Sequence, residues 1–479
     1  MPRMRRDRTR AICPNGARPA PERHTSSNPN DRGDAFMEAN AIRSVAPRMH
    51  TAGKAGTADL VRVIAASTAG SAMEWYDFSI YGTASALIFA DLFFPGLSKA
   101  AGLLAIFGAY AAGFFARPVG GLFFGWLGDR LGRKVVLVAT VLLMGGSTFC
   151  IGLLPTYATA GVWSTVGLVA LRLLQGFGAG AEQAGASLIV SEFAPAERRG
   201  FYAALPFAGC IIGILLAGAM FTWVQHLPKD VFYAYGWRIP FLFSALVVIA
   251  GIVIRMRVKE SPVFEEIQRQ GHTSKQPVRD LLTDSRRTLL VAFGLRVGEN
   301  GSSYLYQVFA LSYLTKVLLV DKSVGTLGIT IAAGLAVVTI PLMGWLSDRF
   351  GRRIMYRLAA LFTCAWAFPA FWLFNTKDPV WIIFGMSVAI GVGVFGMYGI
   401  QGAYFPELFS ARYRYTGVAV SKEFAAVASG GVAPFIAAAL IGWSGGAYWP
   451  IATYIVVLAG VTFLSTFFAP ETRGCDLAG

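Results

Sequence analysis

Long apolar runs separated by short polar links follow the polar stretch 1–58. A helix needs about 20 apolar residues to cross the hydrocarbon core of a bilayer, and each of the runs is long enough. Gly and Pro occur often within the runs, which membrane helices tolerate better than soluble ones. The pattern predicts an all-α integral membrane protein whose twelve transmembrane helices occupy residues 60–88, 101–126, 134–154, 162–190, 201–225, 236–256, 288–315, 324–345, 355–375, 379–404, 415–442 and 448–469.

Two charged links between these runs have nearly the same sequence. GWLGDRLGRK at 125–134 recurs 219 residues later as GWLSDRFGRR at 344–353. A second pair, SEFAPAERRG at 191–200 and PELFSARYRYTG at 406–417, has an offset of 215 residues. Because two separate landmarks share nearly one offset, we infer that the chain contains an internal duplication.

The duplication divides the chain into two halves of six spans each. We expect an N-terminal half at 59–256, a cytoplasmic central loop at 257–287, a C-terminal half at 288–470 and a short cytoplasmic tail at 471–479. The stretch 1–58, which is rich in basic residues, Pro, Gly and Ser, is expected to be a disordered cytoplasmic tail. In membrane proteins built from such repeats, a substrate binds near the bilayer midplane where the repeats meet.

Charged residues are few and unevenly distributed. They make up 14% of the chain, against about 25% in soluble proteins, which excludes a soluble globular protein. If the N-terminal tail lies inside, the links on its side carry 19 Lys and Arg residues and the opposite links carry six. An excess of basic residues marks the cytoplasmic side, so we expect both termini and both repeated links there. This topology also accounts for the net charge of +15 without a nucleic-acid partner.

The repeated links have a spacing that suits a mechanical role. Glycine permits a tight turn and a close approach of helices, and aspartate can accept backbone hydrogen bonds or pair with arginine. We expect a gate at the cytoplasmic mouth that latches the halves in one state and releases them in another. Its residues are Gly125, Asp129, Arg130, Gly132, Arg133, Gly344, Asp348, Arg349, Gly351 and Arg352. Alternatively, the arginines only set the membrane topology.

Several motifs resemble those of a known group of membrane transporters. The repeated G-x-x-x-D-R-x-G-R-[KR] resembles the signature loop of the major facilitator superfamily, and LRLLQGFGAG at 171–180 resembles its fourth-helix motif. More narrowly, the chain resembles the metabolite:proton symporter family, which includes carriers of shikimate, 2-oxoglutarate, citrate, and proline or betaine. The motifs of this narrower resemblance are EWYDF at 74–78, ARPVGG at 116–121, GWRIPF at 236–241, KESPVF at 259–264 and PETRG at 470–474.

The resemblance implies the major facilitator fold and a protein that is not an enzyme. The expected function is secondary active transport, namely proton-coupled symport of a small organic acid such as shikimate or 2-oxoglutarate into the cell by alternating access. Its partners would be the acid, protons and the lipid bilayer. We expect no cofactor and no metal, and a monomer in the bacterial plasma (inner) membrane. Two alternatives stay open: a proton-coupled carrier of a zwitterionic osmolyte such as proline or betaine, and a non-transporting membrane sensor.

Charged residues inside apolar spans are costly, so each is a candidate functional group. Glu74 and Asp77 lie three residues apart on one helix face, and neighbouring carboxylates raise each other's affinity for a proton. Arg296 and Glu299 have the same spacing in the first span of the second half. The expected proton-coupling residues are Glu74, Asp77, Glu182 and Glu299. The alternative is that these acids form structural ion pairs or support helix packing.

Arginine offers a planar, permanently charged fork that fits a carboxylate. We expect Arg172 and Gln175 to point together into the cavity, with Arg172 as the first contact of the substrate anion. The other expected substrate-binding residues are Arg117, Tyr76, Arg296 and Tyr304. Alternatively, Arg172 only neutralises Glu74 or Asp77, and the tyrosines only pack.

Two adjacent charges near the inner end of the eleventh span, Lys422 and Glu423, depart from the uncharged residues of the family that the chain resembles. We expect them to form a pair near the membrane surface. Their presence leaves the identity of the substrate more open than the motifs alone would.

Overall fold

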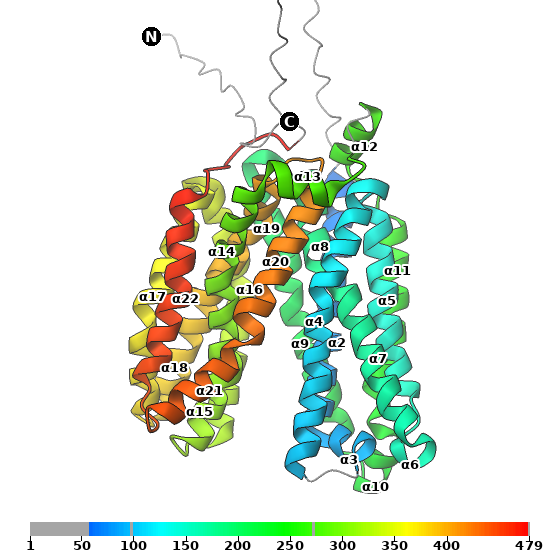
Figure 1. Cartoon of the computed structure of the whole chain (residues 1–479), viewed down its shortest axis with the longest axis vertical. Helices are drawn as coiled ribbons and strands as arrows, with labels where there is room; N and C mark the ends of the chain where they lie inside the picture. The colour runs from blue at the N-terminus through cyan, green and yellow to red at the C-terminus, as the bar shows by residue number, and fades with distance from the viewer. Residues whose placement is uncertain (1–56, 96–98, 271–273, 478–479) are drawn as a thin grey trace, which may run out of the picture.

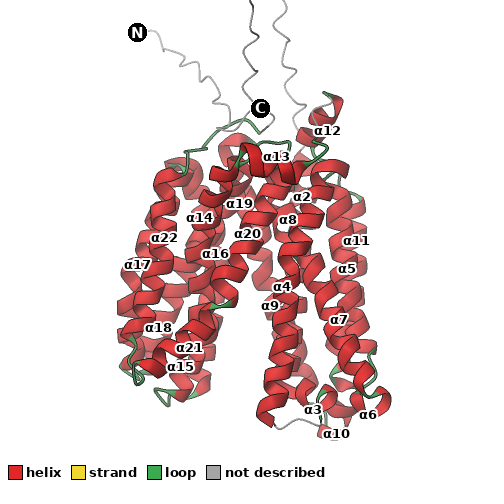
Figure 2. Cartoon of the chain, viewed as in Figure 1, coloured by secondary structure: helices red, strands yellow, loops and turns green. Residues whose placement is uncertain are grey.

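Helices joined by short loops make up most of the described chain (Figure 2). The computed structural model describes residues 57–95, 99–270 and 274–477. Most of the tail expected at 1–58 therefore lies outside the described residues, and the first helix begins at Thr57.

Helices occupy all twelve predicted spans, which confirms the predicted all-α membrane protein. The first half contains α2 (Thr57–Ala84), α3 (Ala90–Phe93), α4 (Lys99–Leu131), α5 (Arg133–Leu153), α6 (Tyr157–Ala160), α7 (Val162–Ala179), α8 (Glu182–Phe193), α9 (Arg199–Gln225), α10 (Lys229–Val231) and α11 (Arg238–Met256). The second half contains α14 (Arg286–Tyr304), α15 (Ala310–Lys316), α16 (Lys322–Phe350), α17 (Arg352–Asn375), α18 (Pro379–Val388), α19 (Phe395–Leu408), α20 (Arg414–Ala425), α21 (Ala433–Trp443) and α22 (Trp449–Phe468). Within the described ranges, nine helical stretches can cross a membrane by length and composition alone.

The long helices form two bundles, α2 to α11 and α14 to α22, which meet at one end of the molecule and diverge toward the other (Figure 1). The two repeated links lie where the bundles meet, and we call this end the turn face. Helix α4 contacts α20 across the boundary, and α9 contacts α16 and α19. Glycine makes the closest approaches possible, because a Cβ on Gly344 would overlap the Gly200 carbonyl oxygen of α9.

The duplication is visible in irregular parts of the helices as well. A π-helical turn at Ser85–Phe89 follows α2, and another at Leu305–Phe309 follows α14, 220 residues later. In each repeated link a glycine with positive φ separates two helices, Gly132 at 107° and Gly351 at 104°. Both glycines thus adopt a conformation that other residues rarely tolerate, as their expected role in tight turns requires.

The central link contains two short helices, α12 (Pro262–Arg269) and α13 (Pro277–Asp284). Helix α13 buries Leu281 and contacts α4 of one bundle and α14 and α20 of the other. Ser285, at its end, shares a hydrogen bond of 2.6 Å with the Tyr413 hydroxyl. The link therefore bridges the two bundles at the turn face, a role that its composition did not predict.

Candidate functional site

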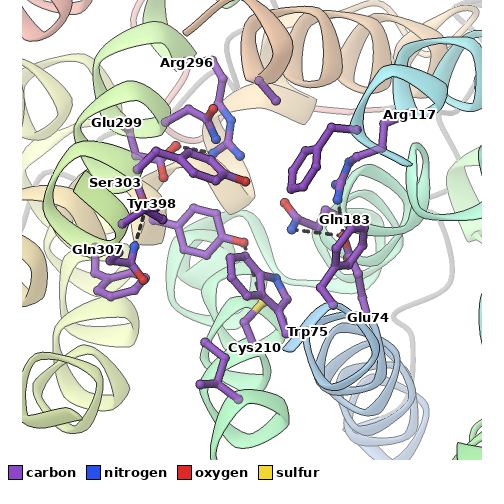
Figure 3. A pocket seen from close by; sticks show the side chains of 18 of the residues that line it. Glu74, Trp75, Arg117, Gln183, Cys210, Arg296, Glu299, Ser303, Gln307 and Tyr398 are labelled. Carbon is purple, nitrogen blue, oxygen red and sulfur yellow. Dashed lines mark hydrogen bonds and ion pairs between the residues drawn. The ribbon is translucent and has the colours of Figure 1, made fainter. Parts of the chain in front are cut away.

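A cavity of about 170 Å³ lies between the two bundles and is lined by side chains from both. Figure 3 shows Glu74, Arg117 and Gln183 of the first half facing Arg296, Glu299 and Tyr398 of the second. The remaining lining residues include the polar side chains of Asn300, Ser303, Tyr304 and Gln307 together with Trp75, Phe78, Phe114, Cys210 and Glu423. Five residues predicted for the site therefore line one cavity: Glu74, Arg117, Arg296, Glu299 and Tyr304.

Arg117 of α4 joins the two halves inside this cavity. Its Nε donates to the Glu423 carboxylate at 2.7 Å, and its Nη2 donates to the Glu74 carboxylate at 3.0 Å. Gln183 adds a weaker hydrogen bond to the same Glu74 oxygen at 3.4 Å. The guanidinium also lies over the rings of Phe78 and Phe114. One buried cation is thus shared by a carboxylate from each half.

A second charged group lies on α14, where Arg296 and Glu299 form an ion pair one helical turn apart. Gln401 binds both partners, because its Oε1 accepts from Arg296 at 2.8 Å and its Nε2 donates to Glu299 at 3.0 Å. The Gln401 amide also donates to the Tyr356 hydroxyl at 2.9 Å. Gln401 lies in an apolar stretch without charged neighbours, so no sequence pattern singles it out.

Arg172 and Gln175 do come together, but they lie inside the first bundle and not among the residues that line the cavity. The Gln175 amide donates to the Thr148 hydroxyl at 2.7 Å, and Asp77 is an electrostatic neighbour of the same group. The rings of Phe78 and Tyr81 lie over the Arg172 guanidinium, which is fully buried. The expectation that this pair points into the cavity is corrected, because these two rings of α2 cover it.

Glu182 and Tyr76 also lie away from the cavity lining. Glu182 forms an ion pair with Arg255 of α11, and its other oxygen accepts a hydrogen bond of 2.7 Å from Thr140. The Tyr76 hydroxyl donates to the Pro240 carbonyl at 2.7 Å. Both residues therefore connect helices within the first bundle.

Lys422 and Glu423 do not form the expected pair near the membrane surface. Glu423 turns toward Arg117, whereas the Lys422 ammonium lies over the Phe207 ring at 4.6 Å from its centroid. Both side chains are buried between the bundles. Consecutive residues of a helix point in different directions, so adjacency in sequence did not indicate pairing.

Each repeated link is bonded to the opposite half through its aspartate. The Asp129 carboxylate accepts hydrogen bonds from the backbone amides of Tyr415 and Thr416 at 3.0 and 2.8 Å, at the start of α20. The Asp348 carboxylate accepts from the amides of Gly200 and Phe201 at 2.8 and 2.9 Å, at the start of α9. A helix N-terminus presents free amides and a partial positive charge, which favours a carboxylate there.

Arginines surround both contacts. Arg133 lies 3.4 Å from Glu192, which also binds Arg414 of the other half at 3.2 Å. In the second link, Arg352 lies 3.1 Å from Glu407, and Glu407 binds Arg199 of the first half at 3.0 Å. Arg130 and Arg349 are exceptions, since their guanidinium groups stack over Trp126 and Trp345. The buried gate arginines Arg133 and Arg352 thus bind an acid of their own half, and an arginine of the opposite half binds the same acid. Arg130 and Arg349 lie outside that network.

Two further acids support the gate and were not assigned a role from the sequence. Glu260 accepts hydrogen bonds from the amides of Arg133 and Lys134, at 2.9 and 3.2 Å, and so caps the start of α5. Glu471 accepts from the amides of Arg352 and Arg353, at 2.8 and 3.1 Å, and caps α17. The sequence feature that could have identified these two acids is the pair of motifs KESPVF and PETRG, which place a glutamate at a similar position after each half.

Comparisons with known proteins identify the family and the fold. The family model described as Major Facilitator Superfamily matches residues 67–434 and 301–474. The Shikimate transporter of Escherichia coli K12 is 38% identical over 415 residues, covering 86% of this chain and 95% of that protein. The Proline/betaine transporter of the same organism is 33% identical over 431 residues, covering 88% and 85%. A solved structure of the proton:xylose symporter XylE matches 88% of the chain with a TM-score of 0.73 at 15% identity, which shows the shared fold.

Proposed function

The chain belongs to the Major Facilitator Superfamily, and we propose that it is a proton-coupled symporter that brings a small organic acid into the cell by alternating access. Its family and its relatives are membrane transporters, so the chain is a multi-pass membrane transporter and not an enzyme. The resemblance expected from the repeated links is thereby confirmed. The substrate class and the residue roles below are our proposals.

The observation that carries the proposal is Arg117, which is held between a carboxylate of each half. A substrate carboxylate that binds the Arg117 fork displaces Glu74 or Glu423 from it. A displaced carboxylate in a buried site is unstable as an anion and is stabilised by taking up a proton. Substrate binding and proton binding are then coupled through one guanidinium.

The cavity chemistry favours an organic acid. Arg117 and Arg296 both line it and offer two forks for carboxylates, while Asn300, Ser303 and Gln307 offer hydrogen-bonding groups for hydroxyls. The shikimate transporter is among the relatives, but so are carriers of proline and betaine. A zwitterionic osmolyte is therefore the second candidate, and its carboxylate would use the same forks.

The roles divide by position. We assign proton exchange to Glu74, Glu299 and Glu423, which line the cavity, and substrate contact to Arg117 and Arg296, with Tyr304 beside them. Asp77 is proposed as a further proton site, because it is a buried carboxylate next to Arg172. Arg172 and Gln175 then serve to position Asp77. Glu182 is bound to Arg255 and would take part only if that pair opens.

The proposed topology places the turn face in the cytoplasm, with both chain ends on that side, in the plasma (inner) membrane of a bacterium. The bonds of Asp129 and Asp348 close the molecule at this face, and in the proposed topology that makes this an outward-facing state. Transport to the inside requires that these bonds break as the two bundles rock. The cavity is complete within one chain, and we propose a monomer.

The test is uptake by the purified protein in liposomes with an inward proton gradient. Shikimate, 2-oxoglutarate, citrate and betaine are compared, each with and without an uncoupler. We expect accumulation of an acid that the uncoupler abolishes. Accumulation of betaine alone would favour the osmolyte carrier, uptake that ignores the uncoupler would contradict proton coupling, and no uptake of any compound would contradict the proposal.

The matched variants are Glu74→Gln in the cavity and Glu265→Gln on α12, where the side chain is half exposed. We expect the first to lose proton-driven accumulation and the second to behave like the wild-type protein.

A further inference from the structure

Lys422 is a buried ammonium group that the proposed mechanism does not use. The residue is 1% exposed, and no carboxylate of the described residues lies within 4.0 Å of its nitrogen. Its close contact is the ring of Phe207, which stacks on Tyr398 at the wall of the cavity with ring centroids 4.3 Å apart. A buried charge without a close counter-ion is costly, and a face-on aromatic ring offsets only part of that cost.

The charges that face Lys422 come from three helices of both halves. They are Arg296 and Glu299 on α14, Glu74 on α2 and Glu423 on its own helix, and Glu74 and Glu423 in turn bind Arg117. This cluster holds three carboxylates, Glu74, Glu299 and Glu423, and three basic groups, Arg117, Arg296 and Lys422. Without Lys422 its formal charge would be −1, and with Lys422 it is zero.

Neighbouring charged groups do not alter this balance. Asp77 lies beside Arg172, and Glu182 binds Arg255. Each of these two sites therefore contains one positive and one negative charge and adds no net charge. The cluster around the cavity is therefore neutral only because position 422 carries a lysine.

We propose that Lys422 determines the charge class of the substrate, making the cavity select a carboxylate anion together with a proton over a zwitterion. The inference rests on the proposed symport of an organic acid. A neutral cluster that receives a monoanion acquires a charge of −1, which a proton on Glu74, Glu299 or Glu423 cancels. A cluster that already carries −1 repels the anion until it has bound one proton, and it then needs a second proton to cancel the charge of the bound anion. A zwitterion adds no net charge to either cluster.

The experiment compares binding of shikimate and betaine to the purified protein by isothermal titration, before any transport step. Lys422→Gln is expected to raise the Kd for shikimate by about tenfold or more, because one positive charge is lost from a site of low dielectric constant. The Kd for betaine should change much less. Lys422→Arg should keep the preference for the acid. Lys229→Gln, at an exposed lysine of α10, serves as the matched control.

A second variant separates charge from packing. Lys422→Gln combined with Glu423→Gln returns the cluster to zero net charge while removing two side chains from it. We expect the ratio of shikimate to betaine affinity to recover toward the wild-type value. If Lys422 only supports the packing of α20, the double variant would be at least as impaired as the single one, and that result would overturn the inference.

The two proposals fail in distinguishable ways. If the wild-type protein binds shikimate and Lys422→Gln leaves the affinity ratio unchanged, the role of Lys422 is overturned and the symport of an acid stands. If the wild-type protein binds betaine and none of the acids, the acid proposal fails, and with it the premise on which Lys422 was assigned. If Lys422→Gln does not fold, Lys422→Arg still tests the inference, because loss of the acid preference in that charged variant contradicts it.

Discussion

Arg117 forms ion pairs with a carboxylate of each half, which makes its planar fork hard to replace. We expect Arg117→Lys to fold but to reduce the initial uptake rate by about tenfold or more, because one ammonium group cannot bridge Glu74 and Glu423 in the same geometry. Arg117→Gln should also lower the thermal unfolding temperature, since removing one partner of a buried ion pair costs roughly 3–5 kcal/mol.

Arg269 is the matched control for that experiment, because its side chain is 75% exposed and only loosely paired with Glu265. Arg269→Lys should leave both the uptake rate and the unfolding temperature unchanged. Wild-type uptake by Arg117→Lys would show that the fork is not required and would remove Arg117 from the coupling step.

Asp77 is buried in the first bundle beside Arg172 and Gln175. Asp77→Asn preserves the size of the side chain but cannot gain or lose a proton. We expect it to lose accumulation driven by a proton gradient and to retain exchange of labelled for unlabelled substrate, which needs no net proton transfer. Asp284→Asn, at an exposed position of α13, is the control. Full accumulation by Asp77→Asn would exclude Asp77 from the mechanism.

Single residues show where sequence reasoning succeeds and where it stops. The cost of charge in a membrane singled out Glu74, Arg117, Arg296 and Glu299, and all four line the cavity. The same rule selected Arg172, but it could not reveal that rings from another helix cover the guanidinium. Residues such as Gln401 and Tyr398 carry no charge, so only the packing of distant helices identifies them.

The helix starts α9 and α20 are held across the molecule by one aspartate each. Asp348→Asn removes the charge and one of the two oxygens that accept from the amides of Gly200 and Phe201, at a cost of about 1–3 kcal/mol for the amide left without a partner. If the contacts act as a latch, the variant should spend less time in the state in which the whole turn face is closed. Hydrogen exchange should then accelerate at the bonded start of α9 and also at the start of α20.

The reciprocal variant is the matched test of that latch. Asp129→Asn should accelerate hydrogen exchange at the same two helix starts, whereas Asp284→Asn should change neither. Acceleration confined to the helix that each aspartate touches would show two independent helix caps. That outcome would contradict a gate that opens as a unit.

Glu260 caps α5 and Glu471 caps α17, through two backbone amides each. We expect Glu260→Ala and Glu471→Ala each to destabilise the protein by about 1 kcal/mol, as lost helix caps do, and to lower the unfolding temperature. Glu265→Ala, at a half-exposed side chain of α12, should have little effect. An unchanged unfolding temperature in both cap variants would mean that other groups satisfy these amides.

The elements themselves were predictable to the extent that apolar length defines them. All twelve spans were located because each must cross the hydrocarbon core, yet α4 extends to Leu131, beyond the expected end. Helices α12 and α13 were not expected, because eight residues are too few for a periodic pattern to stand out. Contacts with the two bundles hold these short helices in place.

The whole molecule adds what no local pattern contains, namely which end is closed. A transporter has the same sequence in its inward-facing and outward-facing states. The repeats therefore predicted a site between the halves, but they did not indicate from which end of the molecule a substrate reaches it. In this structure the bundles meet at the turn face and diverge toward the opposite end (Figure 1). The direction of access is therefore a property of the bonds that close the turn face.

That direction can be measured at Ser303, which lines the cavity on the second half. Ser303→Cys is prepared with the native cysteines replaced by alanine, because Cys210 lines the same cavity. A membrane-impermeant thiol reagent should then react faster in right-side-out vesicles than in inside-out vesicles. Adding Asp348→Asn should raise the inside-out rate at the expense of the outside rate, since the two states share one population. Equal rates from both sides, unchanged by Asp348→Asn, would contradict both the cytoplasmic location of the turn face and its role as the gate.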